Sequence, residues 1–348
     1  MNPSPAEEGG SPEATRQRFT VAIRPQVIPP FSTRPTVERT ASSASSGVGL
    51  DTPFSVCIAV HNEERSLERI VREVQSSSLW QSGAKKELLL CLNGCTDRSL
   101  EIANRLAKAD PSILVLESEQ KGKNFAWMRL VQASAPDSKA LYFVDADVRL
   151  PKDTLTQLAA HFEKELRKSI IGARNLPEPE PEKNRGWYRR AMHRMWFDKD
   201  GTEVLSRPSR RLSGQCYAIT RETAKKIQMP SDQAIMEDAF LRHALKNSWT
   251  IAAEAKIYYR TPTFGGAVKQ QARYEISRQR MAREYPHFED QIGHRDALQD
   301  VGRIEHLRSL PFSTLVGTVM RHAAARIYAT YLTLNNKDSW GKVKSSQM

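Results

Sequence analysis

Two aspartates separated by one residue, Asp145 and Asp147, follow an apolar run that ends at Val144. Carboxylate oxygens are the ligands that Mg²⁺ and Mn²⁺ prefer, and a site with only one or two carboxylates leaves positions for water and a diphosphate. The segment Val144-Asp145-Ala146-Asp147 therefore predicts a metal–diphosphate site. The same residues are also common in ordinary loops after strands, so the segment alone leaves both interpretations open.

A second acidic pair, Glu237-Asp238, begins a predicted helix whose buried face carries Phe240 and Leu241. Acidic residues in a first helical turn stabilise the helix because they complement its dipole, which is the structural interpretation. The functional interpretation is a carboxylate that the dipole keeps ionised. Such a group suits a general base that accepts a proton from a hydroxyl.

Three further polar segments follow predicted strands. They are Val60-His61-Asn62-Glu63-Glu64, Leu92-Asn93-Gly94-Cys95-Thr96-Asp97 and Lys121-Gly122-Lys123-Asn124. The first two have the composition of turns and helix caps, and the first also suits contacts to a nucleotide base. The third brings a basic loop to a helix N-terminus, which is an anion-binding arrangement, although many basic loops are simply solvated.

Apolar periodicity predicts the elements that position these segments. Buried strands are expected at 55–60, 87–92, 113–116 and 140–144, with amphipathic helices between them and a fourth helix opened by Pro151. This alternation predicts βαβ units and a parallel sheet, in which ligands bind at the carboxyl ends of the strands. Residues 174–211 are expected to form a loop with a short helix, and residues 267–334 to be mostly helical.

The order of the motifs resembles that of the family 2 glycosyltransferases over about residues 54–274, because Ser213-Gly214-Gln215 and the Glu-Asp pair follow in sequence. The resemblance implies an α/β protein of the GT-A fold, with a Rossmann-like, mostly parallel sheet flanked by helices. With the Pro- and Ser-rich N-terminus, it predicts four parts: a disordered tail (1–52), a GT-A domain (53–265), a helical C-terminal extension (266–336) and a flexible tail (337–348).

The resemblance also implies roles for individual residues. Donor binding is implied for Val60, His61, Asn62, Glu63, Asn93, Lys121 and Asp145. Asp145 and Asp147 match the motif that holds Mg²⁺ or Mn²⁺, and Asp238 matches the catalytic base. The acceptor or diphosphate side is implied for Gly214, Gln215, Glu237, Gln270, Arg273 and Tyr274. Asn93 replaces an aspartate that the family usually has near the base, which weakens an inference of uracil.

The implied reaction moves one sugar from a nucleotide-sugar, in the first instance a UDP-sugar, to an acceptor hydroxyl with inversion. The segment Gln270 to Tyr274 resembles the Gln-x-x-Arg-Trp signature of polymerising synthases, with tyrosine for tryptophan, and a polar helix surface explains it equally well. Those synthases carry membrane-spanning helices. No window of about 18 residues here is free of charge, so we expect addition of a single sugar.

The 52 basic and 40 acidic residues give a net charge of +12, which favours anionic partners. One stretch combines basic and aromatic residues: Arg185, Trp187, Tyr188, Arg189, Arg190, Arg194 and Trp196. A second stretch is basic only: Arg207, Arg210 and Arg211. One interpretation is that both stretches are solvated loops. The other is that they flank the acceptor site, where they receive an anionic acceptor such as a lipid phosphate or dock the protein on an acidic membrane face. A lipid, a glycan or a small molecule can each be the acceptor.

The segment from Leu315 to Leu334 carries apolar residues on one helical face: Leu315, Val316, Val319, Met320, Ala323 and Ile327. We expect this face to pack on the domain; the alternative is a basic amphipathic helix on a membrane surface. The N-terminus has no apolar secretory segment and the four cysteines lack a zinc spacing, so we expect reduced thiols and a cytoplasmic location, with or without peripheral membrane contact.

Composition excludes collagen-like, disulfide-scaffold and wholly disordered proteins. A nucleotidyltransferase is an alternative, but it would normally carry a Gly-rich loop after the first strand, where His61-Asn62-Glu63-Glu64 has no glycine. Nucleic acid is not an expected partner, because the basic residues form no recognised reading module. An inactive, glycosyltransferase-like binding or scaffold protein is the remaining alternative, against which the intact Asp145, Asp147 and Asp238 argue.

Overall fold

The computed structural model describes residues 48–118, 121–165, 167–179, 186–193, 197, 212–246, 248–288 and 312–335. The chain divides into two compact units, Met1–Ala41 and Ser42–Met348, and every described residue belongs to the second. Both predicted tails, apart from residues 48–52, lie outside the described residues. So do Arg185, Arg194, Trp196 and the stretch from Arg207 to Arg211.

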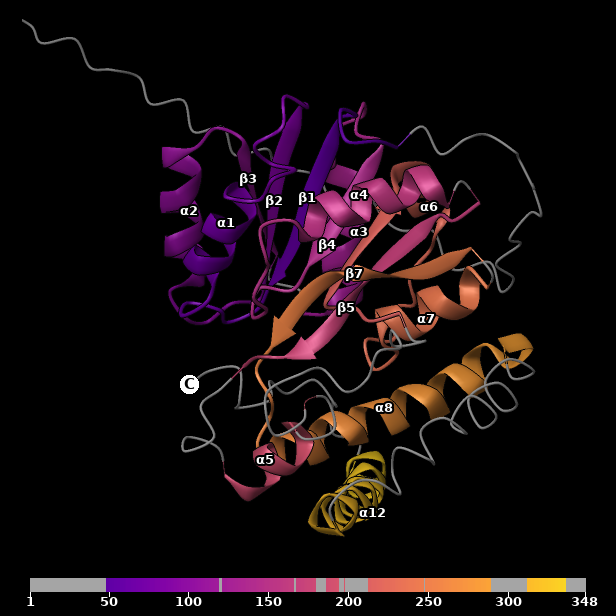
Figure 1. The fold of residues 1–348 in the computed structure, drawn as a ribbon. Helices are drawn as coiled ribbons and strands as arrows, with labels where there is room; N and C mark the ends of the chain where they lie inside the picture. The colour runs from indigo at the N-terminus through magenta and orange to yellow at the C-terminus, as the bar shows by residue number, and fades with distance from the viewer. Residues whose placement is uncertain are drawn as a thin grey trace, which may run out of the picture. The chain divides into compact units, whose positions relative to one another are not determined.

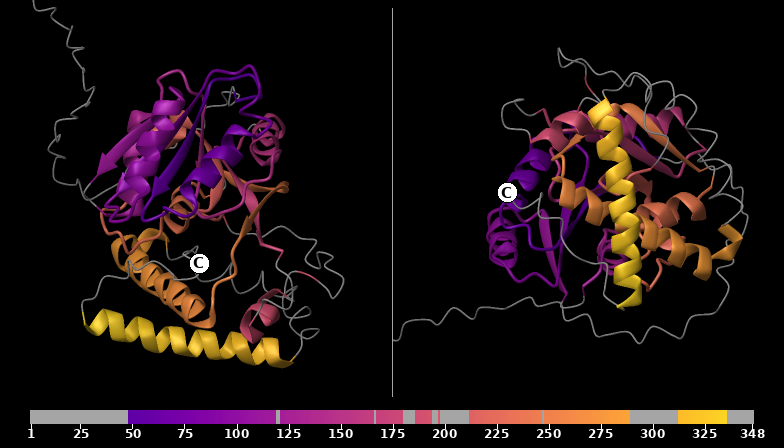
Figure 2. Two further views of the ribbon diagram at one scale, coloured as in Figure 1. Left: turned by 90° about the vertical axis from the view of Figure 1, so that its left-hand side faces the viewer. Right: turned by 90° about the horizontal axis from the view of Figure 1, so that it is seen from below.

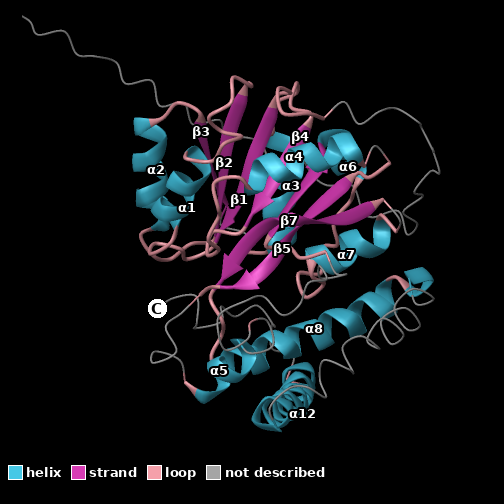
Figure 3. Ribbon diagram, viewed as in Figure 1, coloured by secondary structure: helices cyan, strands magenta, loops and turns pink. Residues whose placement is uncertain are grey.

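A seven-stranded sheet forms the centre of the second unit (Figures 1 and 3). Its strands, in chain order, are β1 (Phe54–Val60), β2 (Lys86–Asn93), β3 (Ile113–Ser118), β4 (Ala140–Val144), β5 (Ile170–Pro177), β6 (Cys216–Thr220) and β7 (Trp249–Tyr259). Their order in the sheet is β3-β2-β1-β4-β6-β5-β7. The first four are parallel, β6 runs antiparallel to both of its neighbours, and β5 and β7 are parallel to each other.

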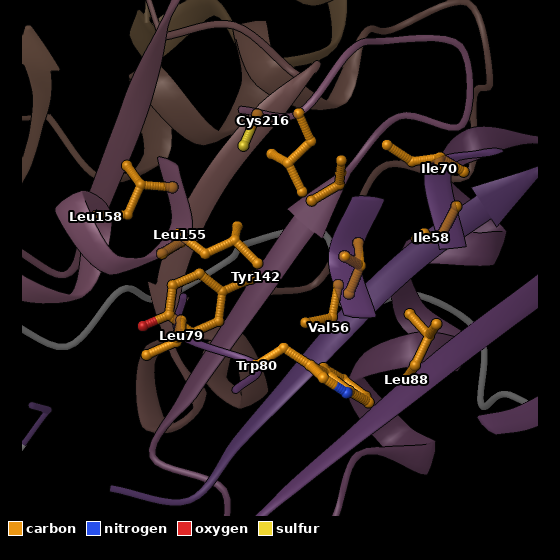
Figure 4. Close-up of a cluster of buried hydrophobic side chains, with 14 of the residues drawn as sticks. Val56, Ile58, Ile70, Leu79, Trp80, Leu88, Tyr142, Leu155, Leu158 and Cys216 are labelled. Carbon is orange, nitrogen blue, oxygen red and sulfur yellow. The ribbon is translucent and has the colours of Figure 1, made fainter. Parts of the chain in front are cut away.

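Helices cover both faces of the sheet. They are α1 (Leu67–Gln75), α2 (Ser99–Ala109), α3 (Lys123–Ala133), α4 (Thr154–Lys164), α6 (Arg221–Lys226) and α7 (Glu237–Ala244). Alternate residues of a strand point to opposite faces. Val56 and Ile58 thus pack with α1 and α4, as Figure 4 shows, whereas Cys57 packs with α3 and α7. The predicted α/β sheet flanked by helices is confirmed, and Cys57, Cys91, Cys95 and Cys216 are free thiols.

In the described part of the chain, three more helices lie beyond the carboxyl ends of β5 and β7: α5 (Trp187–His193), α8 (Phe264–Glu284) and α12 (Phe312–Leu334), with a short 3-10 turn, η2 (Pro286–Phe288), after α8. Figure 2 shows α12 as the outermost of these helices, beneath α8. None of the helices in the described ranges is long and apolar enough to cross a membrane.

Strand β5 is a correction to the sequence analysis, which expected residues 174–177 to belong to a loop. The second half of this strand carries Arg174, Asn175 and Pro177, which mask its pattern. Its pairing with β7 supplies hydrogen-bond partners for the backbone groups of this half of the strand. The pairing continues through a bulge after Ala173. Likewise, α4 begins at Thr154, three residues after Pro151.

The orientation of α12 is a second correction. Its packing face consists of Ala325, Ala329 and Leu332, which contact Ala272 and Ile276 of α8. Small alanine side chains allow two helices to approach closely, so this face is buried instead of the one with the larger residues. The residues that we expected to face inward, Val319, Met320, Ala323 and Ile327, are exposed, and Val316 is half-buried; the side chain of Leu315 lies outside the described set.

Candidate active site

Strand β4 ends at the point where the first acidic pair begins. Asp145 follows Val144 directly, and its N–H donates to the carbonyl oxygen of Gln215 at 2.8 Å. This bond ties the end of β4 to the loop that precedes β6. Asp145 and Asp147 are both half-buried, with Asp147 in the turn that follows.

The side chain of Lys123 connects three parts of the site. Its Nζ donates to Asp145 Oδ1 at 2.8 Å and to the carbonyl oxygen of Gly214 at 3.1 Å, and lies 3.3 Å from Glu237 Oε1. Burial lowers the pKa of the Lys123 ammonium, but the carboxylates of Asp145 and Glu237 outweigh burial and hold the pKa above its usual range. Lys123 therefore carries its charge in the middle of a group of carboxylates.

Glu237 is the most deeply buried carboxyl of this group, with 4% of its surface exposed. Burial raises the pKa of the Glu237 carboxyl to about 8, while Lys123 opposes that shift. One ammonium cannot balance the carboxylates of Asp145, Glu237 and Asp238, so the most buried of the three retains its proton at neutral pH. Gly214 leaves room for the Glu237 carboxyl group, since a Cβ at position 214 would lie 2.6 Å from Glu237 Oε1.

This shift predicts a pH dependence of stability that Glu237→Gln removes. An unfolded Glu237 loses its proton at its ordinary pKa, and the folded one near 8. Between these values the native state binds the additional proton, so the free energy of unfolding decreases as pH rises. Urea unfolding from about pH 5 to pH 8 should show the wild type losing stability relative to E237Q, by at most about 1.4 kcal/mol per pH unit. Parallel curves would contradict the buried, protonated carboxyl.

Asp238 is more exposed than Glu237 and its carboxylate is held in place by backbone groups. Its Oδ2 accepts from the N–H of Gly214 at 3.2 Å, and its Oδ1 from the N–H of Ala239 at 2.8 Å. Asp238 lies in the first turn of α7, as predicted, where the helix dipole favours a negative charge. A carboxylate that is fixed and accessible can accept a proton from a bound hydroxyl.

The segment that leads into α7 is anchored by Asn124, in the first turn of α3. Asn124 is buried and its Nδ2 donates to the carbonyl oxygens of Pro230 (3.2 Å), Asp232 (3.4 Å) and Ile235 (3.0 Å). Its N–H donates to Gln233 Oε1 at 3.1 Å. Gly122, with a φ of 143°, makes space for that amide, because a Cβ would lie 2.1 Å from Gln233 Oε1.

Substituting Asn124 by alanine is expected to destabilise the protein by about 2 kcal/mol, since buried carbonyl groups lose their donor. The start of α7 should also become less well positioned, so turnover should fall more than donor affinity. Urea unfolding and donor titration measure the two effects. Asn335→Ala is the matched control. Among the described contacts, the Nδ2 of Asn335 donates only to the carbonyl oxygen of Tyr331, at the end of the same helix. Equal stability of the two variants would refute the anchoring role.

The predicted nucleotide loops meet at the ends of β1 and β2. His61 Nδ1 lies 2.7 Å from the carbonyl oxygen of Asn93, and Asn62 Oδ1 accepts from the N–H of Thr96 at 2.7 Å. Glu63 is buried and its Oε2 accepts from Ser66 Oγ at 2.5 Å. Asn93 is also buried, and its Oδ1 accepts from the N–H of Gly122 at 2.9 Å. Val60 is the last residue of β1 and accepts at its carbonyl from Cys95 Sγ.

Lys121, predicted as the basic residue near the donor, is exposed, and its role stays a prediction. A second lysine, Lys123, is the one that bonds Asp145. A signal for Lys123 was present. A lysine in the first turn of a helix is unfavourable beside the positive end of the dipole, so it indicates nearby carboxylates. Asn124 was also missed, and no local pattern identifies its distant backbone partners.

The acceptor-side candidates on α8 lie one to two turns before a contact with the start of α7. Ser277 Oγ accepts from the N–H of Met236, the residue before Glu237. Gln270, Arg273 and Tyr274 precede Ser277 by seven, four and three residues, so they share its face of the helix. Tyr274 is exposed and Arg273 half-buried. Gln215, in the loop before β6, has its Oε1 bonded by Asn175 Nδ2 of β5.

The carboxylates fit a divalent cation. Asp145 and Asp147 carry hard oxygen atoms of the kind that Mg²⁺ and Mn²⁺ prefer, and Asp145 already accepts a positive charge, the ammonium of Lys123, at 2.8 Å. Among the described residues, no three His, Cys, Asp or Glu side chains are grouped to hold a metal. The remaining ligands would therefore be diphosphate oxygens and water.

Comparison with known proteins agrees with this architecture. Residues 55–228 match the model of the family described as glycosyl transferase family 2, a segment that contains Asp145 and Asp147 and ends before Asp238. Glycosyltransferase AglD of Haloferax volcanii is 29% identical over 147 residues, which cover 42% of this chain and 23% of AglD. The chain thus spans about a quarter of the length of that relative.

One solved structure shares the fold at low sequence identity. The mannosyltransferase PcManGT from Pyrobaculum calidifontis, in complex with GDP-Man and Mn²⁺, has a TM-score of 0.56 at 13% identity, over 84% of this chain and 90% of that one. Residues 1–349 of S. aureus TarS have a TM-score of 0.46 at 15% identity, over 67% and 65% of the two chains.

Proposed function

The chain belongs to glycosyl transferase family 2, and from that premise we propose that it transfers one sugar from a nucleotide-sugar to an acceptor hydroxyl, with inversion at the anomeric carbon. Its fold is GT-A, as predicted from the motif order. The observation that carries the proposal is the cluster of Lys123, Asp145, Glu237 and Asp238 around Gly214. It joins the end of β4 to the helix that carries the candidate base.

Each residue has a separate task in this reaction. Asp238 accepts the proton of the acceptor hydroxyl, and the oxygen attacks the anomeric carbon as the bond to the diphosphate breaks on the opposite face. Lys123 contributes positive charge beside the departing diphosphate. Asp145 and Asp147 would hold Mg²⁺ or Mn²⁺, which supplies further positive charge to the leaving group when bound.

The donor is a nucleotide-sugar whose base and sugar are open to test. The loops at Val60–Glu63 and Asn93 support nucleotide binding by their place at the strand ends. A UDP-hexose is the first candidate from the motif resemblance. GDP-Man is the second, because the neighbour PcManGT was solved with it. Gln270, Arg273 and Tyr274 support an acceptor site between α8 and α7.

The acceptor that we propose is a lipid or an envelope glycan presented at an anionic membrane face. The excess of basic residues supports it. The enzyme would then work as a peripheral protein on the cytoplasmic side.

Hydrolysis of a panel of nucleotide-sugars, with Mn²⁺ or Mg²⁺ and without acceptor, tests the proposal. We expect slow, metal-dependent release of a nucleoside diphosphate from one donor. That donor, labelled in its sugar, then identifies acceptors. No release and no thermal stabilisation by any donor would favour an inactive, glycosyltransferase-like scaffold instead.

A further inference from the structure

Helix α12 presents large apolar side chains to solvent. Six of the nine exposed large hydrophobic residues in the described part of the chain lie on this one helix: Phe312, Val319, Met320, Ile327, Tyr331 and Leu334, with between 48% and 80% of their surface exposed. Single exposed hydrophobic residues are ordinary, whereas a continuous set marks an interaction surface. We call these six residues the α12 stripe.

The stripe is a single face, because its members recur at helical spacing along 23 residues. The opposite face, with Ala325, Ala329 and Leu332, is the one that contacts α8. Trp187 of α5 is also half-exposed and lies beside α12. A Cβ added to Gly317 of α12 would lie 3.2 Å from the Trp187 ring. The surface therefore extends from α12 to an aromatic residue of a kind favoured at membrane interfaces.

Among the described residues of α12 and α5, no side chain carries a negative charge. α12 contains no Asp or Glu, whereas Arg326 is exposed beside the stripe, and Arg190 is exposed on α5. A soluble partner would need its own acidic rim. A second copy of this chain would place two helices face to face with arginines on both and no acidic side chain on either. An anionic membrane surface satisfies the apolar stripe and the basic margin together.

We propose that α12 lies in the plane of an anionic membrane, with the α12 stripe among the outer parts of the acyl chains and Arg326 at the headgroups. This inference rests on the part of the proposed function that places the acceptor at such a membrane, and it names the docking surface. Its consequence is geometric. α8 contacts α12 through Ala272 and Ile276, and the start of α7 through Ser277. One helix layer, about 10 Å, then separates the membrane from the candidate acceptor side.

Vesicle flotation of the full chain tests the proposal. We expect binding to vesicles of phosphatidylcholine with about a third phosphatidylglycerol, much weaker binding to phosphatidylcholine alone, and a decrease with added salt. The double variant V319E/I327E should lower vesicle affinity more than tenfold, and R326Q by about fivefold. Leu114→Glu, the same kind of change at an exposed residue of β3, is the matched control and should bind like the wild type.

Donor hydrolysis and circular dichroism on each variant establish that it is folded. Hydrolysis without any vesicle binding would overturn the docking surface and the membrane acceptor, and leave the proposed transfer from a nucleotide-sugar intact. Vesicle binding that depends on the stripe, without turnover of any donor, would support the surface and refute the function. A lipid-free dimer that V319E/I327E dissociates, with no vesicle binding, would show that the stripe is a contact between copies and overturn the inference.

Discussion

Asp238→Asn is expected to reduce turnover by about a thousandfold, within the range found for removal of a general base, while the affinity for the donor stays unchanged. Asparagine is nearly the same size, and its amide oxygen can take the place of Asp238 Oδ2 and accept from the N–H of Gly214, at the cost of the bond from the N–H of Ala239, so the loop before β6 should keep its place. What the variant lacks is the capacity to take a proton from the attacking hydroxyl.

Turnover with saturating donor, together with donor binding by calorimetry, separates the two effects. Glu222→Gln is a suitable control, because it is an equal change on the surface of α6, where Glu222 pairs only with Lys226 among the described contacts. Unchanged turnover in D238N would refute the assignment of the base. A matching loss of donor affinity would indicate that Asp238 holds the Gly214 loop and does not accept the proton.

Asp147→Asn is expected to lower kcat/KM for the donor by about a hundredfold at a fixed Mn²⁺ concentration, because the site loses one of its two anionic oxygen ligands. Lys123 is bonded to Asp145 and would remain there, so the variant should fold normally. Removing the metal from the wild type with a chelator should abolish turnover, and added Mn²⁺ should restore it.

A titration of activity against Mn²⁺ concentration measures this effect directly. The curve for D147N should shift to higher Mn²⁺, and high metal should recover part of the rate. Asp153→Asn is the control, since Asp153 is exposed at the start of α4 and bonds Ser78 Oγ there. If chelation has no effect on the turnover of the wild type, the metal proposal is wrong, and the role left for the carboxylates is to balance the charge of the Lys123 ammonium.

The first half of the sheet could be predicted from sequence because three of its strands, β1, β2 and β4, are largely buried on both faces. A strand such as Leu88 to Leu92 is an unbroken apolar run, and each run is followed by a helix with a clear apolar stripe. β5 could not be predicted, since its polar residues are satisfied by pairing with β7, about 80 residues later. Pairing over that distance leaves no local pattern.

The candidate site divides in the same way. The sequence by itself determined which residue types stand at the strand ends: the aspartates after β4, the acidic pair at the start of α7 and the polar loops after β1 and β2. These follow from local rules, because strands end and helices begin where the backbone groups need polar partners.

Only the tertiary structure decided which lysine reaches Asp145, which carboxyl is buried, and which face of α12 packs. Lys121 and Lys123 are lysines of the same short segment, so the sequence does not distinguish them. Only Lys123, at the start of α3, bonds the carbonyl oxygen of Gly214. Glu237 retains its proton because the surrounding chain excludes water from it. α12 has apolar residues on more than one face, and the face with the alanines packs against α8 because it fits that helix most closely. Each outcome depends on contacts between distant segments, which local sequence does not encode.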